Sequence, residues 1–354
     1  MDRSLFGWSA VLARHHAAYY PGFDAGRISG EHRDAYLLLF AEGECVAQPA
    51  GRLRHRARKR SELPVVGDWV AFSRNSAGPA IVRAVFPRSS LLLRAAAGNE
   101  TIEQPIAANV DVLFVVSGLD VDLNLRRVER YLAFALESGV TPVIVLNKSD
   151  WCADLLAHLT PIETAGWNVP VHVVSAARND GIDALAEYAR GGKTLALVGP
   201  SGAGKSSIVN ALLGEARQAT NEVRESDGRG RHTTTSRALF VLPNGGAVLD
   251  TPGMRMLALW DAEAGIGSAF ADVEELGRGC RFNDCGHRGE PGCAIAEALG
   301  NTLDPDRFEA YCKLLREEAH RRRKVDARER AAEFERWKRL HREAREHAKF
   351  KRRQ

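Results

Sequence analysis

Residues 199–206 have the sequence GPSGAGKS, which fits the phosphate-loop pattern G-x-x-x-x-G-K-[ST]. Its glycines would let backbone N–H groups converge on a phosphate, the Lys205 ammonium would neutralise phosphate oxygens, and the Ser206 hydroxyl would ligate Mg²⁺. An apolar run precedes these residues and a helical pattern follows, so a glycine-rich turn that only caps a helix is the weaker interpretation. The residues expected to hold the phosphates are Gly199, Pro200, Ser201, Gly202, Ala203, Gly204, Lys205, Ser206 and Ser207.

A second motif, NKSD at residues 147–150, predicts which base is bound. It ends an apolar strand pattern, and open α/β sheets bind ligands where their strands end. The Asp150 carboxylate would accept hydrogen bonds from guanine N1–H and N2–H₂, and adenine would leave it unpaired. Asn147 would bond the base and a neighbouring loop, and the Lys148 stem would cover the ring. Alone, the motif fits a surface turn equally well. The residues expected at the base are Asn147, Lys148, Ser149, Asp150, and, through their backbone, Ser175 and Ala176.

Two segments farther along the chain are expected to meet the γ-phosphate. The tetrapeptide DTPG at residues 250–253 follows an apolar strand pattern, so Asp250 would hold Mg²⁺ through water and the Gly253 N–H would sense the γ-phosphate. Residues 228–236, GRGRHTTTS, are polar and glycine-rich, which suits a loop that orders around a triphosphate. We expect Thr234 to complete the Mg²⁺ shell, and Thr233 is the alternative.

The residue after DTPG is Met254, which cannot orient an attacking water by hydrogen bonding. Intrinsic hydrolysis should therefore be slow, and stimulation by a partner could raise the rate by about 10³ to 10⁵. His232 is the best candidate for positioning the water, with a solvated loop histidine as the alternative. The expected catalytic residues are thus His232, Thr234, Asp250 and Gly253.

Four metal-binding side chains follow, with the spacing C-x₄-C-x-H-x₅-C: Cys280, Cys285, His287 and Cys293. Three thiolates and one imidazole form a closed tetrahedral set, which is typical of a structural Zn²⁺ site. Metal binding would contribute about 10 to 16 kcal/mol of apparent folding free energy to a segment with little core of its own. The spacing departs from common zinc-finger patterns, so a set of buried free thiols is the alternative.

The predicted elements around these motifs fall into three regions. Up to about residue 100, short β-rich runs between glycines and polar turns favour a small barrel of the oligonucleotide-binding type. From residue 109, apolar strands alternate with helical patterns, which predicts a parallel sheet with helices on both faces. After about residue 259 the strand patterns stop, and a long polar helical stretch begins at residue 304.

Composition and charge indicate the class of protein. With 354 residues, 45% hydrophobic and 27% charged, the chain is neither disordered nor fibrous. It has no secretory leader pattern and no apolar run near the roughly 18 residues that span a bilayer, so we expect an intracellular protein. The net charge of +4 is uneven, because residues 320–354 hold 15 Lys or Arg against 6 Asp or Glu. That surplus, with the basic run at residues 52–60, favours contact with RNA phosphates over a merely solvated surface.

The base-reading motif, the Ser-Ala pair, the phosphate loop, the switch threonine and DTPG follow one another in a cyclic rotation of the usual GTPase order. Because sheet neighbours rather than chain order place the loops, the same site can assemble. With the barrel-like beginning and the Cys/His cluster, these motifs resemble the RsgA family, also called YjeQ, over nearly the full length. Those proteins are circularly permuted bacterial GTPases that depend on the small ribosomal subunit.

The strand and helix patterns and the family resemblance together predict a multidomain α/β protein. Its parts would be an OB-like RNA-binding barrel at residues 1–105, a circularly permuted P-loop GTPase domain at 106–262, and an α-helical zinc-binding domain with a basic tail at 263–354. The resemblance implies a cytoplasmic monomer that binds GTP or GDP, Mg²⁺ and one structural Zn²⁺. It would bind the 30S subunit and 16S rRNA late in maturation, hydrolyse GTP when stimulated, and leave. A P-loop phosphotransferase and a non-catalytic RNA-binding protein that holds GTP are the other functions considered.

Overall fold

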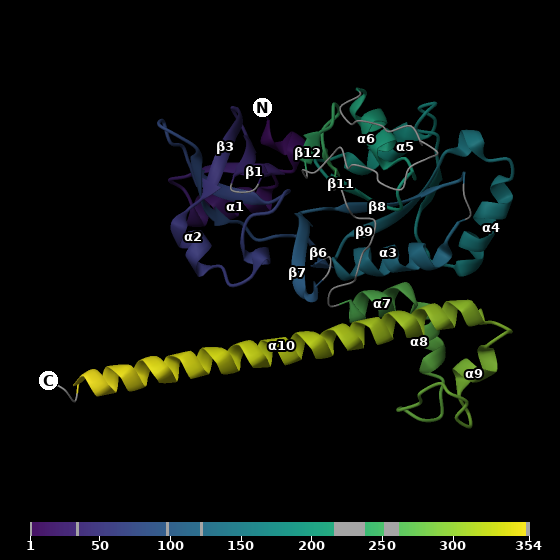
Figure 1. Ribbon diagram of the computed structural model, residues 1–354. Helices are drawn as coiled ribbons and strands as arrows, with labels where there is room; N and C mark the ends of the chain where they lie inside the picture. Colours follow the sequence, from purple (N-terminus) through teal and green to yellow (C-terminus); the bar gives the residue numbers. More distant parts are fainter. Residues whose placement is uncertain are drawn as a thin grey trace, which may run out of the picture.

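Three parts follow one another along the chain: a barrel, a central sheet between helices, and a helical carboxyl-terminal part (Figure 1). The computed structural model describes residues 2–32, 35–96, 99–120, 123–215, 238–250 and 262–351. The predicted fold class is confirmed, because each part has the expected type and position in the chain.

The amino-terminal barrel closes because its five strands pair in the order β1-β2-β3-β5-β4 and β4 pairs again with β1. Apolar side chains fill the interior, where Ile28, Leu38 and Phe72 are fully buried. The strands β6 and β7 form a separate two-stranded sheet. The elements are η1 (Arg3–Phe6), α1 (Ala10–Tyr19), β1 (Asp24–Glu31), β2 (Tyr36–Phe40), β3 (Gly43–Pro49), α2 (Gly51–Arg56), η2 (Arg60–Glu62), β4 (Trp69–Ser73), β5 (Ala80–Val85), β6 (Leu91–Ala96) and β7 (Asn99–Ala108).

Two details of this part differ from a simple barrel with loops. The basic run at residues 52–60 includes most of the helix α2. On this helix Leu53 packs against the buried core, while Arg52 and Arg56 remain exposed. The strand β7 continues through residues 105 and 106, so the expected border between the first two domains lies inside a strand.

Within the described residues, the central sheet has five parallel strands in the order β10-β9-β8-β11-β13, and β12 pairs antiparallel with β13. Because β12 also pairs with β1 at Ala238 and Gly30, the sheet and the barrel are joined by backbone pairing. The strands are β8 (Val112–Gly118), β9 (Thr141–Asn147), β10 (Val171–Val173), β11 (Thr194–Val198), β12 (Ala238–Val241) and β13 (Ala247–Asp250).

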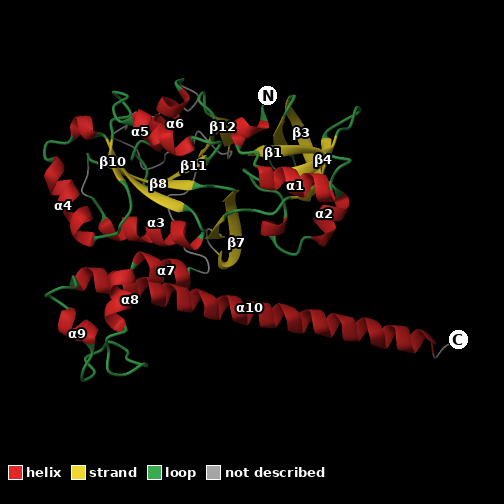
Figure 2. Cartoon of the chain, turned by 180° about the vertical axis from the view of Figure 1, so that it is seen from behind, coloured by secondary structure: helices red, strands yellow, loops and turns green. Residues whose placement is uncertain are grey.

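Helices cover both faces of the central sheet (Figure 2). Along β8, Phe114 belongs to the buried cluster under α5 and α6, whereas its neighbours Leu113 and Val115 belong to the cluster under α3. Burial of successive side chains on opposite faces is typical of parallel strands. The helices are α3 (Leu125–Glu137), η3 (Ser149–Trp151), α4 (Leu155–Ala165), α5 (Ile182–Ala186), η4 (Glu187–Ala189) and α6 (Lys205–Leu213).

The carboxyl-terminal part consists of α7 (Glu263–Ala269), α8 (Ala271–Gly277), α9 (Ala294–Ala298) and the long α10 (Pro305–Lys351). The helix α7 packs along α3, and α10 contacts α7 and β7 before it extends beyond them (Figure 1). Arg307 fixes the beginning of α10, because its guanidinium donates to Glu129 on α3 and to Asp272 on α8. Among the described residues, no helix has the length and apolarity needed to cross a membrane.

Glu129 is a buried acid at this contact, with 4% of its surface exposed. Its Oε1 accepts from Arg307 at 2.8 Å, but within the described ranges nothing donates to its Oε2. Burial raises the pKa of Glu129 to about 7, and Arg307 offsets only part of the rise. The folded protein therefore retains a proton that the unfolded chain loses near pH 4.5. This contribution to stability is complete below pH 4.5 and is lost as the pH rises to about 7.

The substitution Glu129→Gln removes this titration. As the pH rises from 4.5 to about 7, we expect the unfolding free energy of the variant to increase relative to the unchanged protein. The expected increase is on the order of 3 kcal/mol. Urea unfolding across this pH range measures it, and Glu275→Gln on the exposed side of α8 is the control, which should show no trend. A difference that stays constant with pH would contradict the prediction.

Candidate nucleotide and metal sites

The predicted nucleotide residues lie at one edge of the central sheet, where the parallel strands end. The strand β9 ends at Asn147, β11 leads into Gly199, and β13 ends at Asp250. Since β9, β8, β11 and β13 are successive parallel neighbours, their carboxyl ends meet at the same edge. The motifs are therefore close in space although their order along the chain is rotated.

The loop at residues 199–204 requires glycine at two positions because neighbouring groups leave no room. A Cβ on Gly199 would lie 2.2 Å from the Val116 carbonyl oxygen, and a Cβ on Gly204 would lie 2.1 Å from Asn147 Nδ2. Gly204 also has a φ of +88°, in the left-handed region that favours glycine. The helix α6 begins at the next residue, and the N–H groups of a first turn have no acceptor within the helix, which suits an anion. That turn contains Lys205, Ser206 and Ser207.

Lys205 lies over this loop and close to a carboxyl group. Its ammonium donates to the carbonyl oxygens of Gly199 at 2.9 Å and Pro200 at 2.6 Å. Burial raises the pKa of Asp250 at the end of β13, and the nearby Lys205 ammonium offsets part of that rise. A cation and a carboxyl group thus lie close together at the N-terminus of the helix that carries Ser206, which suits phosphates and Mg²⁺.

Asn147 joins three loops at this edge. The residue is 3% exposed, its Nδ2 donates to the Ala203 carbonyl oxygen at 3.0 Å, and its Oδ1 accepts from the Ala176 N–H at 3.0 Å. Ala203 belongs to the phosphate loop, and Ala176 belongs to the predicted Ser-Ala pair. One side chain therefore fixes the base-reading motif, the phosphate loop and the Ser-Ala pair relative to one another.

Asp150 presents a carboxylate beside the Ser-Ala pair. Its Oδ1 accepts a hydrogen bond from the hydroxyl of the buried Ser175 at 2.6 Å. That hydrogen bond lowers the pKa of Asp150 below its ordinary value, so the carboxylate is ionised at neutral pH. An ionised carboxylate only accepts, which matches two guanine N–H donors, whereas adenine offers an acceptor at N1.

Asp120 is a residue of this edge that the sequence prediction missed. It forms an ion pair with Lys148, whose backbone has a φ of +69°. A Cβ on Gly118, at the end of β8, would lie 2.3 Å from Asp120 Oδ1 and 3.6 Å from Lys148 Cδ, so the three residues are closely packed. The signal was available in the sequence, because Asp120 follows an apolar strand pattern just as Asn147 does.

The other predicted nucleotide residues are divided between described and undescribed parts of the chain. The Ser149 N–H donates to the Val174 carbonyl oxygen at 3.1 Å, which holds NKSD beside the end of β10. Ser201 and Gly202 are exposed at the tip of the phosphate loop. The predictions for His232, Thr233, Thr234 and Gly253 fall outside the described residues.

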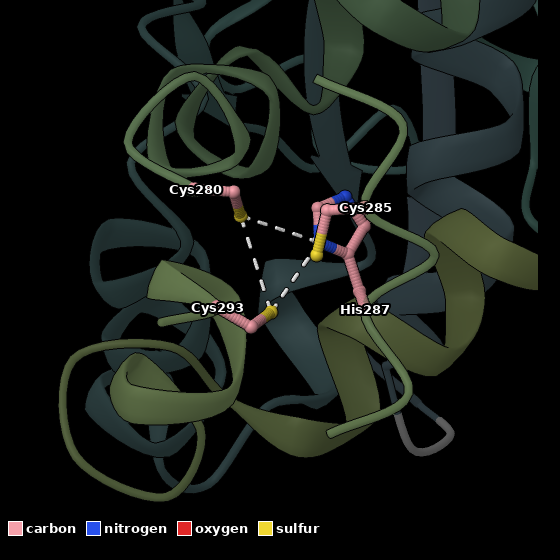
Figure 3. A group of neighbouring side chains, drawn as sticks. All are labelled: Cys280, Cys285, His287 and Cys293. Atoms are coloured by element: carbon pink, nitrogen blue, oxygen red, sulfur yellow. Dashed lines mark hydrogen bonds between the residues drawn. The ribbon is translucent and has the colours of Figure 1, made fainter. Parts of the chain in front are cut away.

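The four predicted metal ligands come together between α8 and α9, with all their ligand atoms within 4.8 Å of one another (Figure 3). The Sγ atoms of Cys280 and Cys293 are 3.9 Å apart, and each lies 3.5 Å from His287 Nδ1. Tetrahedral Zn²⁺ with Zn–S of about 2.3 Å and Zn–N of about 2.0 Å requires about 3.8 Å between two sulfur ligands and about 3.5 Å between a sulfur and a nitrogen ligand. Cys285 completes the set, and the donors therefore fit Zn²⁺ in both chemistry and spacing.

The backbone around this cluster is held by its own hydrogen bonds. The Glu290 carboxylate accepts from the N–H groups of Gly286 at 3.0 Å and Arg288 at 2.6 Å. His287, between them, has a φ of +56°, which turns its ring toward the thiols. The Cys293 Sγ accepts from the Ala296 N–H at 3.4 Å at the beginning of α9. The loop is thus shaped by contacts around the four ligands, as metal sites require.

Comparison with known proteins agrees with this geometry. Residues 85–260 match the family model described as RsgA GTPase. A small ribosomal subunit biogenesis GTPase RsgA from Opitutus terrae is 45% identical, and the match covers 96% of each chain. The protein of the same name from Syntrophotalea carbinolica is 44% identical, and the match covers 88% of each chain.

Two solved structures have the same architecture. The crystal structure of YjeQ from Thermotoga maritima has a TM-score of 0.61 at 28% identity and covers 83% of this chain and 98% of that one. YloQ, described as a circularly permuted GTPase, shares the fold with a TM-score of 0.58 at 24% identity, over 86% of this chain and 97% of that one.

Proposed function

We propose, because this chain belongs to the RsgA family of GTPases, that it hydrolyses GTP at the carboxyl edge of its central sheet during biogenesis of the small ribosomal subunit. The observation that carries this proposal is the pair of hydrogen bonds that Asn147 forms, as donor to Ala203 and as acceptor from Ala176. They support a single nucleotide site, because a guanine base and its phosphates must be held at one fixed separation. A site for phosphates alone would not need the base-reading motif to be joined to the phosphate loop.

The described side chains have distinct proposed roles toward GTP. Asp150 accepts from guanine, the Lys148 stem covers the base, and Lys205 with the amides of the phosphate loop neutralises the phosphates. Ser206 and Asp250 would hold Mg²⁺, which when bound neutralises charge on the β- and γ-phosphates. Thr234 as a further Mg²⁺ ligand, Gly253 as a γ-phosphate sensor and His232 as the residue that positions water remain part of the proposal.

The Cys/His cluster is proposed to hold one structural Zn²⁺. The ligand separations support this role, as does the absence of an open position in a set of three thiolates and one imidazole. The metal would fix the chain between α8 and α9, where few large apolar side chains are buried. Its role is therefore to fold the third of the proposed domains, 263–354, which follows the barrel at 1–105 and the GTPase domain at 106–262.

The proposed partner is the 30S subunit, contacted through 16S rRNA. Exposed basic side chains on and after α2 and the surplus of Lys and Arg in residues 320–354 support contact with phosphates. Such contacts predict that binding weakens as salt concentration rises. We further propose that the protein acts in the cytoplasm as a monomer.

Phosphate release from GTP and ATP, with and without purified 30S subunits, tests the proposal. We expect slow release from GTP alone, an increase of about 10³ to 10⁵ with subunits, and no comparable release from ATP. The substitution Lys205→Ala should lower the stimulated rate by on the order of 10²- to 10³-fold, because it removes a cation that stabilises developing charge.

The matched control is Lys193→Ala, which should leave the rate unchanged. Lys193 is exposed and stands just before the amino end of β11, away from the phosphate loop at the carboxyl end. Equal use of ATP and GTP would favour a phosphotransferase. Tight GTP binding without phosphate release under any condition would favour a protein that only holds the nucleotide.

A further inference from the structure

Arg27 on β1 is a buried cation that the proposed GTP chemistry does not use. Only 1% of the residue is exposed, and its guanidinium donates to acceptors on four separate segments. The acceptors are the carbonyl oxygens of Phe6 (2.6 Å), Gly67 (3.0 Å) and Asn109 (3.1 Å) and the hydroxyl of Thr194 (2.8 Å). All four acceptors are neutral, and they belong to η1, the barrel, the connection to β8, and β11.

Keeping an arginine at this position has a cost in stability. Burial lowers the pKa of Arg27 to about 10, and the charges of Asp111 and Asp68 oppose the shift. A well-packed apolar side chain often replaces a buried ion without loss of stability, so packing alone does not explain the arginine. What the guanidinium adds is a rigid, planar set of donors that holds four segments in one geometry.

Thr194 connects this residue to the phosphate loop. It is the first residue of β11, which has five residues and leads directly into Gly199. Its backbone is held as firmly as its hydroxyl, because its N–H donates to the Asp111 carboxylate at 2.7 Å and its carbonyl oxygen accepts from the Asp111 N–H at 2.9 Å. β11 pairs with β8 on one side and with β13 on the other, so its backbone connects Thr194 to Gly199 without a break in the sheet.

The barrel and the nucleotide loops lie at opposite ends of the parallel strands of the central sheet. Arg27 reaches the amino end of β11, and beside it the Gly246 N–H of the β12–β13 turn donates to the Leu5 carbonyl oxygen at 2.7 Å. The phosphate loop lies at the carboxyl end of the same strand. An effect of the barrel on the nucleotide through this contact therefore has to pass along the sheet, and β11 is the direct connection.

We propose that Arg27 is a positioning residue that couples the barrel to the phosphate loop through Thr194 and β11. The inference rests on the proposed function, in which contact of the barrel with the small subunit is the input and faster GTP hydrolysis is the output. Arg27 does not contact the nucleotide. It transfers a displacement of β1 to β11, and so changes the position of Gly199 and Lys205 relative to the neighbouring loops.

The variants Arg27→Met and Thr194→Val test this coupling. Each should leave unstimulated GTP hydrolysis and GTP affinity unchanged and lower the stimulation by 30S subunits by about 5- to 150-fold, the usual range of coupling between sites. The double variant should lose no more than either single variant, because the two residues act as one unit. Thr141→Val is the matched control, since Thr141 is the exposed first residue of β9, which β8 separates from β11.

Equal losses of stimulated and unstimulated rates would mean that the pair is merely structural, and an unchanged stimulation would also overturn the coupling. Thr194→Val keeps the β-branched shape and removes only the hydroxyl that accepts from Arg27, so it tests the inference even if Arg27→Met does not fold.

A measurement without ribosomes separates this inference from the proposed function. Coupling is reciprocal, so GDP binding should slow amide hydrogen exchange in β1 and β4 of the barrel as well as in the phosphate loop. In both variants the slowing should persist in the loop and disappear from the barrel. Absence of any slowing in the barrel of the unchanged protein would overturn the coupling. Slowing in the barrel without stimulation by 30S subunits would instead leave the coupling standing and contradict the proposed function.

Discussion

The substitution Asp150→Asn is expected to reverse the base preference of the site. Xanthine has a carbonyl at C2 where guanine has an amino group, and an asparagine amide can donate to that carbonyl while its oxygen accepts from N1–H. We expect the ratio of affinities for GTP and xanthosine triphosphate to change by about 10⁴ to 10⁵, the range for a site whose buried polar groups lose or gain partners. Competition binding with the two nucleotides measures this ratio.

Asp183→Asn provides the matched control for this substitution, because Asp183 is an exposed aspartate at the beginning of α5. It should leave the preference for GTP unchanged. If Asp150→Asn continued to prefer GTP, Asp150 would not be the group that reads the base, and its hydrogen bond with Ser175 would have only a structural role.

Removal of the proposed zinc is expected to have the largest effect on stability. Cys293 is 2% exposed and lies within 3.9 Å of Cys280 Sγ, so Cys293→Ser should abolish tight metal binding. The apparent folding free energy lost is about 10 to 16 kcal/mol, which is comparable to the entire unfolding free energy of a typical domain. We expect the segment around α8 and α9 to unfold while the central sheet still binds nucleotide.

Elemental analysis and hydrogen exchange measure these two consequences. The unchanged protein should contain one zinc per chain, and a strong chelator should increase exchange in α8 and α9. The control is Cys312→Ser, because Cys312 is half-buried in α10 and is not part of the cluster. A protein that is isolated without zinc and retains full protection in α8 and α9 would contradict the metal site.

The functional residues that stand directly after a strand were the part of the site that the sequence predicted most readily. Gly199 to Ser206, Asn147 and Asp250 each stand at the end of an apolar run, and parallel strands bring such ends to one edge. The Cys/His cluster was predictable for a different reason, since its four ligands lie within 14 residues and need no distant partner.

Contacts between distant segments were not predictable in the same way. Arg27 occupies a strand whose pattern gives no sign that its guanidinium reaches Thr194, 167 residues away. The ion pair of Asp120 and Lys148 depends on the adjacency of β8 and β9 and on the left-handed backbone of Lys148. The continuation of β7 through residue 105 depends on its pairing with β6, which composition does not reveal.

The separation between Arg27 and Thr194 also affects the order in which the chain can fold during synthesis. The barrel emerges first, but one acceptor for its buried guanidinium is made 167 residues later. Until then the charge lacks that partner, and hydration of the guanidinium competes with closure of the barrel around it. We therefore expect the newly synthesised barrel to remain loosely packed and accessible to chaperones until β11 has left the ribosomal exit tunnel.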